Sequence, residues 1–143
     1  FVSGTYKITA ANNGLVGKDS VSIKDGTYTI TSGGDGIKST NTDETDQGYV
    51  IIDGGTFTIT AEGDGIQADK TLNISGGTID IQQCYEGIEG FNIVIDDGDI
   101  RVTSSDDAIN AAGKSEDTET TSSTGEEKPS ADSQQIQRQR VGK

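Results

Sequence analysis

The sequence contains no histidine, no methionine and no tryptophan, and it has a single cysteine and a single proline. Without histidine, the nucleophilic schemes that pair a serine or cysteine with a histidine base are excluded. The lone cysteine, Cys84, excludes an internal disulfide, and without a histidine partner it is better explained as a turn residue than as a nucleophile. With four tyrosines and three phenylalanines as the only aromatic residues, we expect no aromatic platform for crystalline cellulose.

Basic residues are also scarce, since 11 lysines and arginines stand against 24 acidic residues, for a net charge of −13. Nearly all of the excess negative charge lies in residues 1–112. Such a surface repels nucleic acid and anionic lipid and attracts metal cations. We therefore expect no nucleic-acid partner. The sequence shows neither a signal peptide nor an apolar run of membrane-spanning length, and we expect no membrane insertion.

What the sequence does contain is one unit repeated five times. Each copy begins with a glycine, usually followed by threonine, then an alternation of apolar and polar residues, a polar stretch, and an acidic or amide residue before a glycine and an aliphatic residue. The copies start 21 or 22 residues apart, with one longer gap of 29. Their first residues are Gly4, Gly26, Gly55, Gly77 and Gly98. A fixed period of this length is typical of a solenoid.

Apolar residues alternate with period two, and isoleucine, valine, threonine and tyrosine favour strands. No segment has helical periodicity, and two leucines are too few for a leucine-rich repeat. We therefore expect an all-β chain, a right-handed parallel β-helix of about five coils of 21–22 residues. Five inward columns of like residues follow from the alignment: Tyr6/Tyr28/Phe57/Ile79/Ile100, Ile8/Ile30/Ile59/Ile81/Val102, Leu15/Ile37/Ile66/Ile88/Ile109, Val21/Val50/Leu72/Ile93 and Ile23/Ile52/Ile74/Ile95.

The repeats divide the chain into segments. Residues 1–112 carry the coils, and the longer gap predicts an inserted polar loop at 39–48. Residues 113–143 are polar and low in complexity, which predicts a disordered or irregular tail, or a long loop before further coils. Neither end has the character of a cap, so we expect a fragment of a longer protein. We also expect further coils, a partner chain or another copy to stack end to end on an open edge.

The residue before the glycine-aliphatic step is the main candidate for chemistry. In a stacked solenoid these residues form one column, called here the acidic column: Asn13, Asp35, Asp64, Glu86 and Asp107. Carboxylates at the strand spacing of about 4.8 Å repel each other unless protons or cations lie between them. Calcium prefers oxygen ligands, and one ion can bridge neighbouring coils. We predict metal ligation by Asp35, Asp64, Glu86, Asp107 and the adjacent Asp106.

An alternative needs no metal. Aspartate-glycine and asparagine-glycine are turn dipeptides, in which the side chain bonds the backbone and the glycine supplies positive φ. A repeated turn then gives a repeated aspartate, as at Asp25-Gly26 and Asp97-Gly98.

The unit G-T-[YF]-T-I-T-x-x-G-D-G-I, with its x-[IL]-x-I-x-G-G junction, resembles the bacterial calcium-binding, carbohydrate-binding β-helix domain family over about residues 4–112. Asp35-Gly36-Ile37 and Asp64-Gly65-Ile66 match the unit most closely, while Glu86 and Asp107-Ala108 depart from it. The resemblance implies a pectate-lyase-like fold, calcium, an acidic or plant-type polysaccharide ligand, and a place on exported, extracellular or cell-surface bacterial proteins.

The sequence thus predicts a non-catalytic, calcium-dependent carbohydrate-binding or adhesion module. Two alternatives remain open at this stage. One is a purely structural surface solenoid or filament-forming scaffold. The other is a fragment of a calcium-dependent polysaccharide lyase, for which Lys38 is the best candidate base because it lies close to the acidic column.

Overall fold

The computed structural model describes residues 1–43 and 47–111, and these residues contain strands and no helix. The predicted tail 113–143, together with residue 112 and residues 44–46 of the predicted inserted loop, lies outside the described residues. The strands are β1 (Thr5–Ala10), β2 (Leu15–Gly17), β3 (Ser20–Ile23), β4 (Thr27–Ser32), β5 (Ile37–Ser39), β6 (Tyr49–Ile52), β7 (Thr56–Ala61), β8 (Ile66–Ile74), β9 (Thr78–Gln83), β10 (Ile88–Ile95), β11 (Asp99–Val102) and β12 (Ile109–Asn110).

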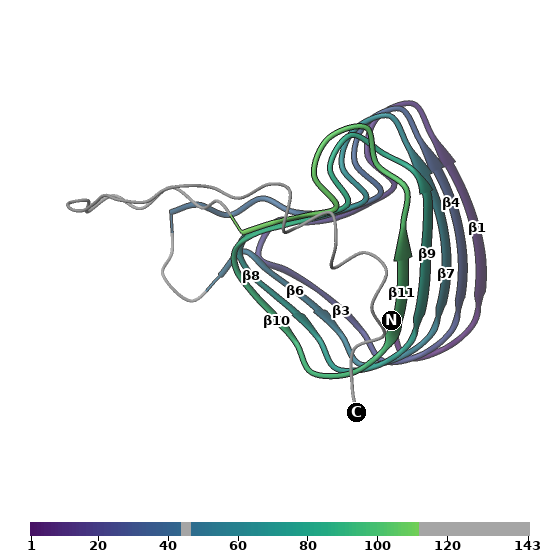
Figure 1. The fold of residues 1–143 in the computed structure, drawn as a ribbon. Coiled ribbons are helices and arrows are strands. Elements are labelled where there is room, and N and C mark those ends of the chain that lie inside the picture. The colour runs from purple at the N-terminus through teal and green to yellow at the C-terminus, as the bar shows by residue number, and fades with distance from the viewer. Residues whose placement is uncertain (44–46, 112–143) are drawn as a thin grey trace.

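One sheet collects the first strand of every repeat. Its order is β1-β4-β7-β9-β11, and all neighbours are parallel. Figure 1 shows these strands side by side in chain order. The pairing aligns Tyr6 with Tyr28, Tyr28 with Phe57, Phe57 with Ile79 and Ile79 with Ile100. Because equivalent residues pair up to a register shift after Ile59 between β7 and β9, the repeat in the sequence is also the register of most of the sheet.

The second sheet collects the remaining strands, in the order β12-β10-β8-β5-β2, with β3 paired to β6 and β6 to β8. The strands β8 and β10 are long because each pairs over both parts of this sheet, so that β5 and β6 lie beside different portions of β8. Here too equivalent residues pair, for example Leu15 with Ile37 and Ile37 with Ile66. All strand pairs in both sheets are parallel, as the sequence predicts.

The core lies between the two sheets. The predicted inward residues of the middle repeats are buried, including Tyr28, Phe57, Ile66 and Leu72. The rings of Tyr6, Tyr28 and Phe57 stack with centroids 5.0 and 4.8 Å apart. A chain of modest hydrophobic content can therefore form a core, because each apolar residue meets its equivalents in the repeats on either side.

Glycine serves two purposes in the first four repeats, and the last repeat has Ala108 at the second of the two positions. The first glycine of each copy has a positive φ, for example 124° at Gly26 and 105° at Gly77, where other residues are strained. The glycine after the acidic column was expected to share this property, and that expectation is wrong. Gly36 has no positive φ; instead a Cβ there would lie 2.5 Å from the Gly65 carbonyl oxygen and 2.7 Å from Ile59 Cγ2. This second glycine is required because neighbouring repeats approach too closely for a side chain.

Candidate functional site

The residues of the acidic column lie in register at one corner of successive repeats. Each following backbone N–H donates to the carbonyl of the next column residue, as from Gly36 to Asp64 at 2.9 Å and from Gly65 to Glu86 at 2.8 Å. The corner precedes β5, β8, β10 and β12, whose register carries the alignment onward. The predicted stacking of these residues is confirmed, whereas their role as metal ligands stays a prediction.

The side chains of the column also bond to one another's backbone, which the sequence did not reveal. Asn13 Oδ1 accepts from the Asp35 N–H at 2.8 Å, Asp35 Oδ1 from the Asp64 N–H at 2.7 Å, and Asp64 Oδ1 from the Glu86 N–H at 3.2 Å. One oxygen of each side chain therefore holds the next repeat in place. The side chains thus bond the next repeat's backbone, whereas the turn alternative expected bonds to the backbone of their own turn.

Among the described acids of the column, Asp35 is set apart by an ion pair with a lysine. Oδ1 accepts the Asp64 N–H, and Oδ2 lies 2.8 Å from Lys38 Nζ. The Asp35 side chain is 13% exposed and that of Lys38 is 26% exposed. The Lys38 ammonium thus takes the place that a cation would fill at this repeat, and Asp35 belongs to neither of the carboxylate groups defined below. Lys38, the candidate base of the lyase hypothesis, is therefore engaged in an ion pair with Asp35.

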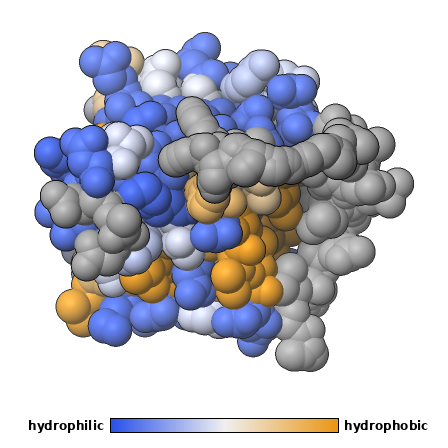
Figure 2. Space-filling view, turned by 90° about the vertical axis from the view of Figure 1, so that its left-hand side faces the viewer, coloured by the Kyte–Doolittle hydropathy of each residue, from blue (hydrophilic) through white to orange (hydrophobic). Residues whose placement is uncertain are grey.

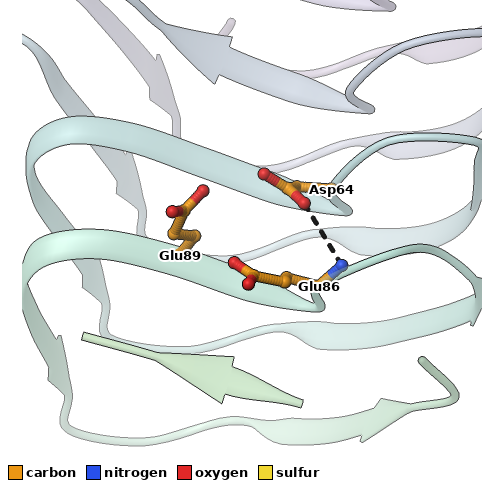
Figure 3. Close-up of side chains that lie close together, drawn as sticks. All are labelled: Asp64, Glu86 and Glu89. Atoms are coloured by element: carbon orange, nitrogen blue, oxygen red, sulfur yellow. Dashed lines mark hydrogen bonds between the residues drawn. The ribbon is translucent and has the colours of Figure 1, made fainter. Parts of the chain in front are cut away.

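The first carboxylate group consists of Asp64, Glu86 and Glu89, whose oxygens lie within 4.8 Å of one another. Figure 3 shows their three side chains gathered between two neighbouring repeats. Glu89 lies on β10 and was not among the predicted ligands. Its signal in the sequence is the spacing of three residues from Glu86, which repeats the spacing of Asp35 and Lys38. A side chain three residues after the column reaches back to it in both repeats.

The second carboxylate group consists of Glu86, Asp106 and Asp107, again with oxygens within 4.8 Å. The structure thus brings together four of the five predicted ligands and leaves Asp35 aside. Glu86 belongs to both groups, and its Oε1 accepts a hydrogen bond of 3.0 Å from Asn110 Nδ2. The two groups therefore form a continuous row of carboxylates along the stack.

This crowding changes the acidity of the glutamates. Burial raises the pKa of Glu89 to about 8, assisted by a hydrogen bond with Asp64 and by the charges of Asp64, Glu86 and Asp35. Burial also raises the pKa of Glu86, and the charges of Asp64, Asp106 and Asp107 act in the same direction, against the hydrogen bond from Asn110. The row binds positive charge readily, either as protons or as a cation.

The donor atoms fit a calcium ion. All are oxygens, and two ligands at about 2.4 Å from one ion lie at most about 4.8 Å apart, a limit that the oxygens within each group satisfy. Gln67 pairs in register with Glu89, and its Oε1 is buried without a hydrogen-bond partner in the described part of the chain. An amide oxygen is a common calcium ligand. Asp64, Glu86, Glu89, Asp106 and Asp107 are the residues that would hold the ion, which would supply a positive centre for anionic ligands.

Two neighbours of the row differ in exposure. The Cys84 thiol is buried, and burial together with the charge of Asp64 raises its pKa to about 11, so it is not a nucleophile at neutral pH. Tyr85, the next residue, has half of its surface exposed.

Within the residues that the structure describes, no helix has the length and apolar character needed to cross a membrane.

Comparison with known proteins identifies a family. A search of curated proteins and a search of solved structures found no match. A family model described as "Carbohydrate-binding domain-containing protein" matches residues 1–128, which include both sheets and both carboxylate groups. The chain therefore belongs to the family of carbohydrate-binding domain-containing proteins.

Proposed function

We propose that this chain is a non-catalytic, calcium-dependent module that binds acidic polysaccharide, carried by an exported bacterial protein and acting in binding or adhesion at the cell surface. Family membership supports a carbohydrate ligand. The observation that carries the calcium dependence is the pair of carboxylate groups that share Glu86. Calcium held there would supply a positive centre for the carboxylates of a uronate chain.

The fold we propose is the right-handed parallel β-helix of about five coils, with residues 1–112 as the binding unit and 113–143 as a separate polar segment. Support comes from the parallel pairing of equivalent strands in repeat order in both sheets. A wound ribbon stacks one corner of every coil, so ligands from successive coils line up along the axis. This stacking suits a linear polymer, whose own repeats can follow the row.

The choice of an acidic glycan follows from charge. The protein is strongly negative, so it repels a uronate polymer unless cations lie between the two. The row of carboxylates offers a place for those cations.

A structural role is the second candidate, and the hydrogen bonds along the acidic column favour it. Asn13, Asp35 and Asp64 each bond the backbone of the following repeat. In this alternative, calcium stabilises the stack and binds no glycan. The two functions differ in whether glycan binding disappears with calcium.

The test is pull-down of the purified chain with insoluble polygalacturonate, with calcium and with a calcium chelator. We expect retention with calcium and release by the chelator. Glu86→Gln removes the shared carboxylate and is expected to abolish retention, whereas Asp25→Asn, at an exposed turn outside both groups, is expected to leave it unchanged. A chain that melts higher with calcium but never binds polysaccharide establishes the scaffold role instead.

A further inference from the structure

An exposed aromatic side chain lies beside the carboxylate row. Tyr85 directly precedes Glu86 and is 52% exposed. In the two preceding repeats its position is occupied by Gly34 and Gly63, as the backbone bonds from Gly63 to Gly34 at 2.9 Å and from Tyr85 to Gly63 at 2.7 Å show. A large ring therefore stands at a corner where these repeats have no side chain.

The backbone of Tyr85 is held by the repeats on both sides. Its backbone N–H donates to Gly63, and its carbonyl accepts from the Asp106 N–H at 2.9 Å. The charge of Asp106, a member of the second carboxylate group, raises the pKa of the Tyr85 hydroxyl. On the other side, Gly63 and Gly34 offer no side chain to cover the ring. Because its backbone is fixed, this exposed ring has less conformational entropy to lose on binding than a ring on an unpaired segment.

We propose that Tyr85 is the stacking platform for a pyranose ring of the bound glycan, next to the second carboxylate group. The face of an aromatic ring carries partial negative charge and is apolar, which suits the C–H face of a sugar. Carbohydrate sites of this kind combine an apolar surface with a few polar groups that fix orientation. The inference rests on the proposed function, because the neighbouring carboxylates and their calcium would hold the acid group of the same or the next sugar.

Other aromatic side chains fit this role less well. Tyr6, Tyr28 and Phe57 stack on one another, and Phe1 packs edge-on against Tyr6 and Tyr28. Phe91 of β10 is 38% exposed. Figure 2 shows the side of the molecule where β10 lies, with hydrophobic patches among hydrophilic residues. The ring of Phe91 carries no polar group. Phe91 serves as the matched exposed aromatic residue for comparison with Tyr85.

The first experiment measures binding of a galacturonate oligosaccharide in calcium by titration calorimetry. Tyr85→Ala is expected to weaken binding on the order of tenfold, Tyr85→Phe to keep most of the affinity, and Phe91→Ala to bind as the parent chain does. The affinity for calcium alone, measured without glycan, is expected to stay unchanged in all three. Equal losses in Tyr85→Ala and Tyr85→Phe contradict stacking, because the hydroxyl would then carry the effect, and a matching loss of calcium affinity contradicts it as well.

The second experiment does not depend on removing the ring. Since the chain has no tryptophan, Tyr85→Trp introduces a single indole whose emission reports its surroundings. We expect the oligosaccharide to shift this emission in calcium, and we expect no shift for Phe91→Trp. An unchanged Tyr85→Trp spectrum with bound glycan overturns the role of Tyr85 and leaves the proposed function intact.

Cello-oligosaccharide provides the neutral arm. If the parent chain binds only the neutral sugar and Tyr85→Ala weakens that binding, the platform stands and the acidic preference is wrong. If the parent chain binds neither sugar, the proposed function fails and the platform fails with it.

Discussion

Replacing Glu89 by glutamine is expected to change stability in opposite directions with and without calcium. Glu89 lies within 4.8 Å of Asp64 and Glu86. At that distance each pair of charges repels by about 0.9 kcal/mol in water and about 3.5 kcal/mol at an effective dielectric constant of 20. These side chains are partly exposed, so the lower figure is the better guide. Removing one charge therefore relieves about 2 kcal/mol over the two pairs.

In the calcium-free protein this relief depends on pH. The pKa of Glu89 is raised in the folded state from 4.5 to about 8, so the folded chain holds a proton that the unfolded chain has released. Its contribution to stability is complete below about pH 4.5 and is lost as the pH rises through 8. Glu89→Gln lacks this loss and is expected to be the more stable protein at pH 8 by up to about 2 kcal/mol.

With calcium the order reverses. An ion at a concentration one hundred times its dissociation constant stabilises the folded state by about 2.7 kcal/mol, or about 10 °C in melting temperature for a domain of this size. Glutamine offers a neutral oxygen in place of a charged one, so most of this gain is expected to disappear in Glu89→Gln.

The assay is thermal denaturation at pH 8, with excess calcium and with chelator, followed by circular dichroism. Glu62→Gln is the matched control, because Glu62 is exposed near Asp64 and belongs to neither carboxylate group. A Glu89→Gln protein whose melting temperature shifts equally in both conditions shows that no ion is shared at this carboxylate.

Three further outcomes follow from the structure. Asp35→Ala is expected to lower the free energy of unfolding by about 3 kcal/mol, because it leaves the Asp64 N–H and the Lys38 ammonium without their partner. Asp35→Asn is expected to lower it by less. Urea unfolding measures the free energy of unfolding of both variants. Phe57→Ala removes the last ring of the core stack and is expected to cost about 3–5 kcal/mol, and a urea midpoint close to that of the parent chain would contradict the packing. Cys84, buried and with its pKa raised to about 11, should react with a thiol reagent only as fast as the chain opens, whereas rapid labelling of the native protein would contradict its burial.

The sequence predicts strand pairing well because the same residues recur at nearly equal spacing. Once Tyr28 pairs with Phe57, the alternation of inward and outward residues fixes every neighbouring pair. The same reasoning places Asp64 beside Glu86. Sequence alone therefore predicts the stacking of the candidate ligands.

The details of the site could not be predicted in this way. The inclusion of Glu89 depends on a side chain that reaches back from a strand, and the exclusion of Asp35 depends on the ion pair with Lys38. The need for Gly36 comes from the distance between repeats, which the sequence does not state. These features depend on side-chain conformation and on the close approach of backbones.

Asn13 separates the structural function of the acidic column from its charge. Its amide oxygen accepts the Asp35 N–H at 2.8 Å, as the Asp35 carboxylate accepts the Asp64 N–H. A neutral side chain can thus accept the same hydrogen bond from the next repeat, so this bond does not require a carboxylate. At Asp35 the charge is balanced by Lys38. The described residues offer no such lysine to Asp64, Glu86 and Glu89, where charge accumulates at a cost in repulsion. A cation would offset that cost, so the calcium proposal rests on the two carboxylate groups and not on the whole column.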